Sequence, residues 1–107
     1  MVSYSAINSV PMSFNSYFLF GILRDELKFK GFTISDYDDI LRAETMQLPR
    51  TFMNVSEDRA YALMLNAGTD MIMLSGQHDE FGSLVGRITK EAKKNVEKGL
   101  LKEERLT

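Results

Sequence analysis

The feature that most constrains the fold of this chain is an alternation of short apolar segments with longer amphipathic ones. The short segments are "MVS" at residues 1–3, "GFTIS" at 31–35 and "DMIML" at 70–74. Each is only a few residues long, and "GFTIS" carries the β-branched side chains typical of strands that are buried on both faces. We therefore expect a strand at each of these places.

The segments that follow these strands have the period of helices. Apolar residues recur in them at steps of three and four, which places them on one helical face. We expect Asn15 or Ser16 to cap the first helix and Ser56 the second, with Gly31 and Gly68 just beyond their ends. The predicted buried faces are Phe18, Leu19, Ile22, Leu23 and Leu27, then Ala60, Leu63, Met64 and Ala67, then Phe81, Leu84, Val85, Ile88, Ala92 and Val96.

The resulting order, βαβαβα, predicts an α/β fold with a parallel sheet and right-handed crossovers. Three parallel strands by themselves leave two unpaired edges, which fits a piece of a larger barrel better than a finished sheet. The chain begins at what reads as the end of a strand and closes in "LLKEERLT", which reads as the opening of a helix. We expect residues 1–107 to be a fragment of a larger domain.

The charge composition of the chain bears on which classes of partner it can bind. Thirteen Lys and Arg against fifteen Asp and Glu leave a net charge of −2, without the basic field that neutralises phosphate backbones or anionic lipid. We expect no nucleic-acid and no membrane partner. Cysteine is absent and "MVSYSAIN" has no secretory-signal pattern, so the cellular compartment stays unknown.

Asp36 is the strongest candidate for chemistry, because it follows a predicted buried strand at the edge where α/β proteins place their ligands. Tyr4 and Ser75 follow the other two strands at the same edge. The alternative interpretation is that Asp36 only starts a turn. The long loop it opens, residues 36–55, favours function. Asp38 and Asp39 are close in sequence, but their side chains are expected to point apart, so we predict no metal site.

Other polar residues carry weaker signals. Arg42 has the chemistry to bond a carboxylate or a sugar hydroxyl, although a solvated loop arginine is commoner. His78 is the single histidine and forms no triad by spacing. Met71 and Met73 are expected to fill core, and Asp70, at the start of its strand, to be structural. No Gly-rich phosphate loop follows a strand, so we expect no nucleotide cofactor, and no cofactor of any kind.

Four motifs together resemble one known family. They are a strand ending in Ser-Tyr with an Asn-x-x-Pro loop, the helix "LRDEL", the segment "GFTISDY", and "AGTDMIM". Their order and spacing resemble the amino-terminal barrel domain of glycoside hydrolase family 3, the β-glucosidase and exo-β-glucanase group. The resemblance covers nearly the whole chain.

This resemblance implies a (β/α)₈ TIM-type barrel, of which the chain would be the last three βα units. It implies that Asp36 is the nucleophile of a retaining glycosidase and that Tyr4, Tyr37 and Arg42 bind substrate. The general acid and further sugar-binding residues would come from the missing remainder of the barrel and a following domain. Tyr37 stands where the family often has Trp, and Asp38 stands where Gly or Glu is common.

The leading hypothesis is therefore a fragment of an exo-acting β-glycosidase that hydrolyses β-linked oligosaccharides or glucosides through a covalent intermediate on Asp36, inactive by itself. The alternative is a small α/β binding or signalling module in which Asp36 accepts a phosphoryl group or binds a metal. A degenerate piece without activity is the third possibility.

Overall fold

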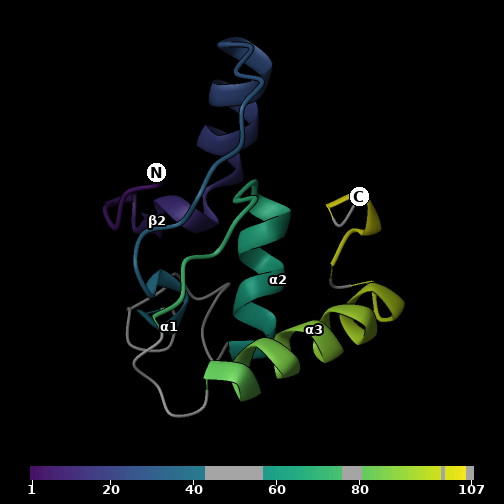
Figure 1. Cartoon of the computed structure of the whole chain (residues 1–107). Helices are drawn as coiled ribbons and strands as arrows, with labels where there is room; N and C mark the ends of the chain where they lie inside the picture. The colour runs from purple at the N-terminus through teal and green to yellow at the C-terminus, as the bar shows by residue number, and fades with distance from the viewer. Residues whose placement is uncertain (43–56, 76–80, 100, 106–107) are drawn as a thin grey trace.

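The computed structural model of the chain describes residues 1–42, 57–75, 81–99 and 101–105, and some side chains inside its helices, that of Arg42 among them, lie outside the description. Figure 1 shows the arrangement of its longer helices. Helix α2 (Glu57–Ala67) stands at the centre, α3 (Phe81–Glu97) crosses its lower end, and η2 (Tyr17–Glu26) rises beyond its other end.

The first predicted helix, η2, is confirmed, but it is wound as a π-helix. The N–H of Leu27 accordingly bonds to the carbonyl of Ile22, five residues back, at 2.9 Å. Asn15 caps the start, because its side-chain oxygen accepts the N–H of Phe18 at 3.3 Å. The left-handed residue after the helix is Lys28, with φ 56°, rather than Gly31.

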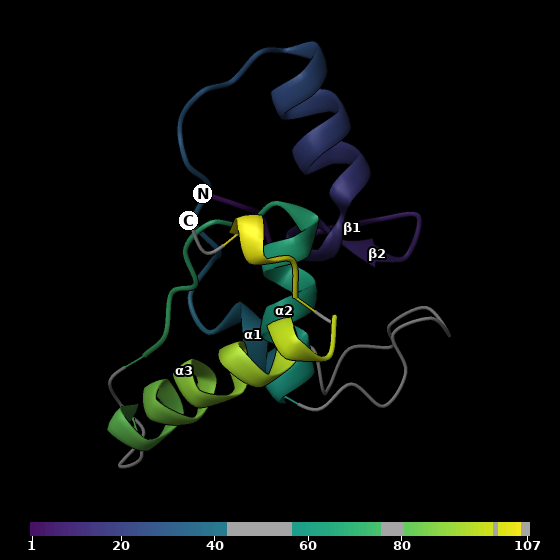
Figure 2. The same ribbon diagram turned by 90° about the vertical axis from the view of Figure 1, so that its right-hand side faces the viewer.

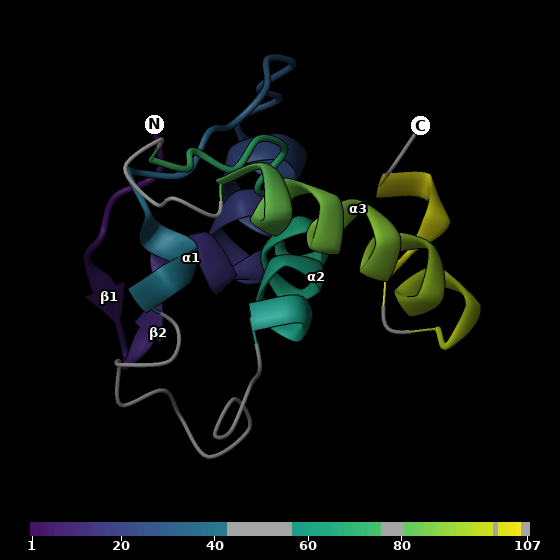
Figure 3. The same cartoon turned by 60° about the horizontal axis from the view of Figure 1, so that its bottom comes forward.

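Helices α2 and α3 are also confirmed. Gly68 follows α2 with φ 117° and Gly99 follows α3 with φ 70°, as helix-terminating glycines do. Figure 3 shows α3 lying alongside α2, and α1 (Asp39–Arg42) packs on α2 as well. The buried core gathers where these helices meet, and consists of Phe14, Ile40, Ala60, Tyr61, Ala62, Met64 and Leu101.

A short hairpin occupies the turn-rich stretch before η2. Its strands β1 (Ala6–Ile7) and β2 (Val10–Pro11) pair antiparallel. Asn8 and Ser9 between them have φ 51° and 64°, the pair of positive values that a two-residue hairpin turn needs. A single 3₁₀ turn, η1 (Met12–Phe14), connects the hairpin to η2.

The three predicted strands appear as segments that lie side by side without forming continuous ladders. The N–H of Val2 bonds to the carbonyl of Ile34 at 2.7 Å, and Ile34 forms a parallel bridge with Met71. The segments before α1 and after α2 descend together in Figure 1. The second and third segments pair in parallel at Ile34 and Met71, as predicted. Side-chain oxygens replace several main-chain acceptors, so the described segments hold only this one parallel bridge.

The chain beyond α3 returns to the end of α2. Its last turn, η4 (Glu103–Arg105), lies beside that end in Figure 2, and the Nε of Arg105 donates to the carbonyl of Leu65 at 2.6 Å. This contact satisfies one of the carbonyls left free at a helix end. In the parts of the chain that the structure describes, none of the helices combines the length and apolar character needed to cross a membrane.

Candidate active site

Asp36 lies at the end of the second parallel segment, directly before α1. The residue is half-buried, and its Oδ1 accepts the N–H of Tyr37 at 2.8 Å. Its carbonyl accepts a second bond, from the N–H of Asp39 at 3.3 Å. Asp36 thus makes the local bonds that the turn-residue interpretation expects. These bonds also fix the backbone that carries its carboxylate.

Tyr4 lies against this turn from the neighbouring segment. Its hydroxyl donates to the carbonyl of Tyr37, thirty-three residues along the chain. The structure thus brings the predicted residues Tyr4, Asp36 and Tyr37 together at one edge. Tyr37 is 48% exposed, which leaves this residue accessible to a ligand.

The carboxylates of Asp38 and Asp39 bond to different parts of the chain. The Oδ1 of Asp38 accepts the N–H of Ser75 at 2.6 Å, which confirms that the end of the third segment reaches the same edge. Asp39 is buried, and its carboxylate accepts the hydroxyl of Ser13 from η1. The carboxylates of Asp36, Asp38 and Asp39 therefore do not converge, and the described residues contain no acidic or histidine cluster suited to a metal ion.

The side chain of the candidate Arg42, and the whole of His78, lie outside the described part of the structure. Arg42 ends α1, and His78 falls within residues 76–80. The expectation for Met71 was wrong in this chain, because its side chain is 51% exposed instead of filling core. Met73 is half-buried.

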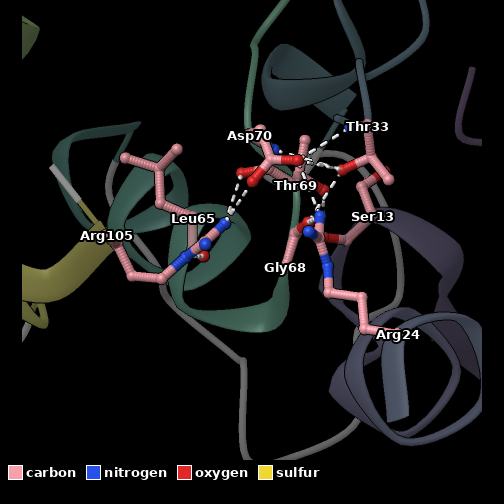
Figure 4. Close-up of polar contacts among 8 residues, drawn as sticks. All are labelled: Ser13, Arg24, Thr33, Leu65, Gly68, Thr69, Asp70 and Arg105. Atoms are coloured by element: carbon pink, nitrogen blue, oxygen red, sulfur yellow. Dashed lines mark hydrogen bonds and ion pairs between the residues drawn. The ribbon is translucent and has the colours of Figure 1, made fainter. Parts of the chain in front are cut away.

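The opposite end of the parallel segments carries a charged cluster around Asp70, drawn in Figure 4. One carboxylate oxygen of Asp70 pairs with Arg24 at 2.6 Å and the other with Arg105 at 2.8 Å. The same carboxylate accepts the N–H of Thr33 at 2.7 Å. Both guanidinium groups also lie over the ring of Phe20, at 5.5 and 5.2 Å from its centroid.

These contacts set the charge state of Asp70. Burial by itself would raise the pKa of this carboxyl, but the hydrogen bonds from Thr33, Arg105 and Arg24 outweigh burial and lower the pKa from 3.8 to about 2. The cluster joins η2, the end of α2 and η4, which confirms the structural role expected for Asp70. Sequence reasoning missed both arginines, because nothing in their spacing links them to residue 70.

A cavity of about 410 Å³ also opens at this end, away from Asp36. Its walls are mainly apolar and include Met1, Leu19, Leu23, Phe29 and Phe32. None of the predicted site residues lines it. The candidate site is therefore the polar edge around Asp36 and not this cavity.

Comparison with known families matches residues 1–107 to the family described as "Glycosyl hydrolase family 3 N terminal domain". The match spans the two parallel segments and the turn that carry Tyr4, Asp36 and Tyr37.

Curated relatives agree with this match. The chain is 37% identical over 91 residues to a β-xylosidase of Formosa agariphila, covering 85% of this chain and 12% of that protein. It is 31% identical over 81 residues to the periplasmic β-glucosidase of Salmonella typhimurium, covering 76% of this chain and 10% of that protein. The chain thus spans about a tenth of the length of these relatives.

A solved structure has the same fold. It is a β-glucosidase involved in saponin metabolism from intestinal bacteria, and it superposes with a TM-score of 0.68 at 27% identity. The superposition covers 96% of this chain and 12% of that one.

Proposed function

The chain belongs to the glycosyl hydrolase family 3 N-terminal domain family, and from this membership we propose that Asp36 is the nucleophile of a retaining β-glycosidase. That domain is a TIM barrel, and we place this chain as its last three βα units. The carboxyl ends of the parallel segments would then form part of the active-site face of the barrel.

The observation that carries the proposal is the position of Asp36. It stands at the carboxyl end of a parallel segment, its carbonyl accepts the N–H of Asp39 and the hydroxyl of Ser35, and the residue is half-buried without an ion pair to any described residue. A nucleophile needs a fixed position and a carboxylate that substrate can reach. Tyr4, held against the following peptide, and the exposed Tyr37 would line the sugar site with Arg42.

The chemistry is a double displacement. Asp36 attacks the anomeric carbon, the glycosidic bond breaks, and a general acid elsewhere in the parent protein gives its proton to the leaving oxygen. Water activated by the same group then attacks the glycosyl-enzyme and frees Asp36. Two carboxyl groups about 5 Å apart are needed, and this chain supplies the nucleophile.

The relatives named β-xylosidase and β-glucosidase support a substrate with a terminal β-linked glucose- or xylose-like unit. The rival module, with Asp36 as phosphoacceptor or metal ligand, has no support in the geometry. Such a site needs converging oxygens, whereas Asp38 and Asp39 bond to Ser75 and Ser13 on opposite sides.

The test is covalent trapping. The full-length protein is incubated with 2-deoxy-2-fluoro-β-glucoside and β-xyloside carrying a good leaving group, digested, and searched for the label by mass spectrometry. We expect the label on the peptide that contains Asp36. A label on a different carboxylate would refute the assignment and return Asp36 to the role of a turn residue.

A further inference from the structure

The backbone pairing beside Asp36 has an unusual acceptor. The N–H of Ser35 donates to the carbonyl of Met71 at 2.8 Å, as in a parallel ladder. The next ladder bond would run from the N–H of Met73 to the carbonyl of Ser35. It runs instead to the hydroxyl of Ser35, at 2.9 Å.

The same exchange occurs again at Asp38. Its N–H donates to the carbonyl of Met73 at 3.1 Å, so the pairing resumes one residue beyond Tyr37, whose N–H an unbroken parallel ladder would use. The N–H of Ser75 then bonds to the carboxylate of Asp38, at 2.6 Å, in place of the main-chain carbonyl. The side chains of Ser35 and Asp38 thus accept the N–H groups of the third segment where the main-chain carbonyls of the second segment do not.

Asp36 and Tyr37 lie between these two anchors, and the hydrogen bonds of their backbone go to other partners than the third segment. The hydroxyl of Ser35, which accepts from Met73, donates to the carbonyl of Asp36 at 3.0 Å, so it bridges the neighbouring segment to the nucleophile's own peptide. The carbonyl of Tyr37 receives the hydroxyl of Tyr4. The stretch that carries Asp36 is thereby released from the ladder and held at both ends.

We propose that Ser35 and Asp38 are positioning residues for Asp36: their side chains replace ladder carbonyls, which lets residues 36–37 leave the sheet edge while keeping the carboxylate fixed. The inference rests on the proposed function of Asp36 and adds to it two residues that do not touch the sugar. Ser35 is fully buried, so its hydroxyl has the geometry for these two bonds and not for substrate.

The backbone at residue 38 explains which side chains can do this. Asp38 has φ 51°, a conformation that glycine, asparagine and aspartate adopt more readily than other residues. Its carboxylate must also reach the N–H of Ser75. Asparagine meets both needs, glycine meets only the backbone need, and alanine meets neither.

The experiment uses the full-length protein and four variants: Asp38→Asn, Asp38→Gly, Asp38→Ala and Ser35→Ala. Asp25→Asn, an exposed carboxylate on η2, is the matched control. For each protein, inactivation by the 2-deoxy-2-fluoro glycoside yields a first-order rate constant, an apparent affinity and a labelled fraction at the end point. The melting temperature is recorded as well.

We expect Asp38→Gly, Asp38→Ala and Ser35→Ala to lower the rate constant by about tenfold with little change in apparent affinity, because small displacements of a reacting group slow the chemical step. Asp38→Asn should keep most of the wild-type rate constant and so react faster than Asp38→Gly. Partial unfolding would lower the labelled fraction and leave the rate constant of the remaining sites unchanged, so the two effects are separable even if one variant folds poorly.

Three results would overturn the inference while leaving Asp36 as nucleophile. They are a wild-type rate constant in Asp38→Gly and Ser35→Ala, an Asp38→Asn protein as slow as Asp38→Gly, or a loss confined to the labelled fraction. A label on another carboxylate in the wild-type protein would instead refute the proposed function, and the inference with it.

Discussion

Asp36 combines a local backbone bond with a position that depends on distant residues. Its carboxylate bonds to the next N–H, which any aspartate at a turn can do. The residues on either side of it are bonded to Tyr4, Met73 and Ser75, which come from the neighbouring parallel segments.

We predict that Asp36→Asn in the full-length protein lowers kcat on aryl β-glycosides by about 10³-fold or more, because the amide cannot form the glycosyl-enzyme. Size is preserved, so the melting temperature and sugar binding should stay close to those of the wild type. Steady-state kinetics and calorimetry check this, with Asp25→Asn as the control. A variant that keeps a tenth of the wild-type kcat would contradict the nucleophile assignment.

Ionisation of Asp70 should affect the stability of this chain. Its folded-state pKa of about 2 lies below the ordinary value of 3.8, so the folded state favours the charged form. The resulting stabilisation is present above about pH 4 and is lost as the pH falls through the folded-state pKa near 2. Its size, reduced for partial solvent screening, is about 1–2 kcal/mol.

We therefore predict that Asp70→Asn lowers the free energy of unfolding at pH 7 and flattens its pH dependence between about pH 4 and 2. Urea unfolding at low protein concentration and several pH values measures this. Asp25→Asn, on the exposed part of η2, should leave the curve unchanged. Parallel curves for Asp70→Asn and wild type across this acid range would show that the arginine contacts do not stabilise the charged form.

The junction between α2 and η2 depends on Gly68. Its φ of 117° is strained for any other residue, and an added Cβ would lie 2.9 Å from the Cβ of Leu19 and 3.3 Å from the ring of Phe20. The helix end and the packing of η2 therefore both require a glycine at this position.

We predict that Gly68→Ala destabilises the chain by about 1–3 kcal/mol, whereas Gly86→Ala stabilises it by about 0.5–1 kcal/mol. Gly86 is an exposed position inside α3, and an added Cβ there meets no atom within 4 Å. Chemical unfolding of both variants gives the comparison. Equal effects of the two substitutions would mean that the Gly68 backbone relaxes without cost.

Large apolar side chains remain exposed over much of the molecule. Leu27, Phe32 and Met71 are 68%, 65% and 51% exposed, and Phe29 and Phe32 also border the apolar cavity. Patches of this kind in a soluble chain normally pack against other protein. They are the surfaces on which we expect the remainder of the barrel to lie.

We predict that the chain produced alone self-associates or is poorly soluble, because these patches and the unpaired segment edges have no cover. Size-exclusion chromatography with light scattering measures the mass. Phe32→Ser should reduce association, and Lys30→Ser, an exposed neighbour, should not. A monodisperse monomer with a cooperative melt would contradict the expectation.

We also predict that the isolated chain does not hydrolyse aryl β-glucosides, since the general acid and most of the sugar site would be absent. Release of the aryl group is measured against an Asp36→Ala preparation purified in the same way. Turnover above that background would show that a complete site forms within 107 residues.

The sequence by itself determined the helices and the family. Helices α2 and α3 follow from apolar residues at three- and four-residue steps and from the glycines after them, which are local signals. The family follows from four motifs in order along the chain, and residues 1–107 match it. The edge shared by Tyr4, Asp36 and Ser75 also follows, because parallel strands bring their carboxyl ends together.

Only the tertiary structure decided how the parallel segments pair and what holds the site. Asp70 bonds to Arg24 and Arg105, 46 and 35 residues away, and no local pattern marks such partners. The spacing of apolar residues likewise predicted a helix at η2 but did not indicate that it is a π-helix. Ser35 and Asp38 accept ladder bonds because their oxygens, instead of the backbone carbonyls, meet the N–H groups of a segment that is distant in sequence. Spacing predicts which residues share an edge, but contact geometry decides which atoms bond there.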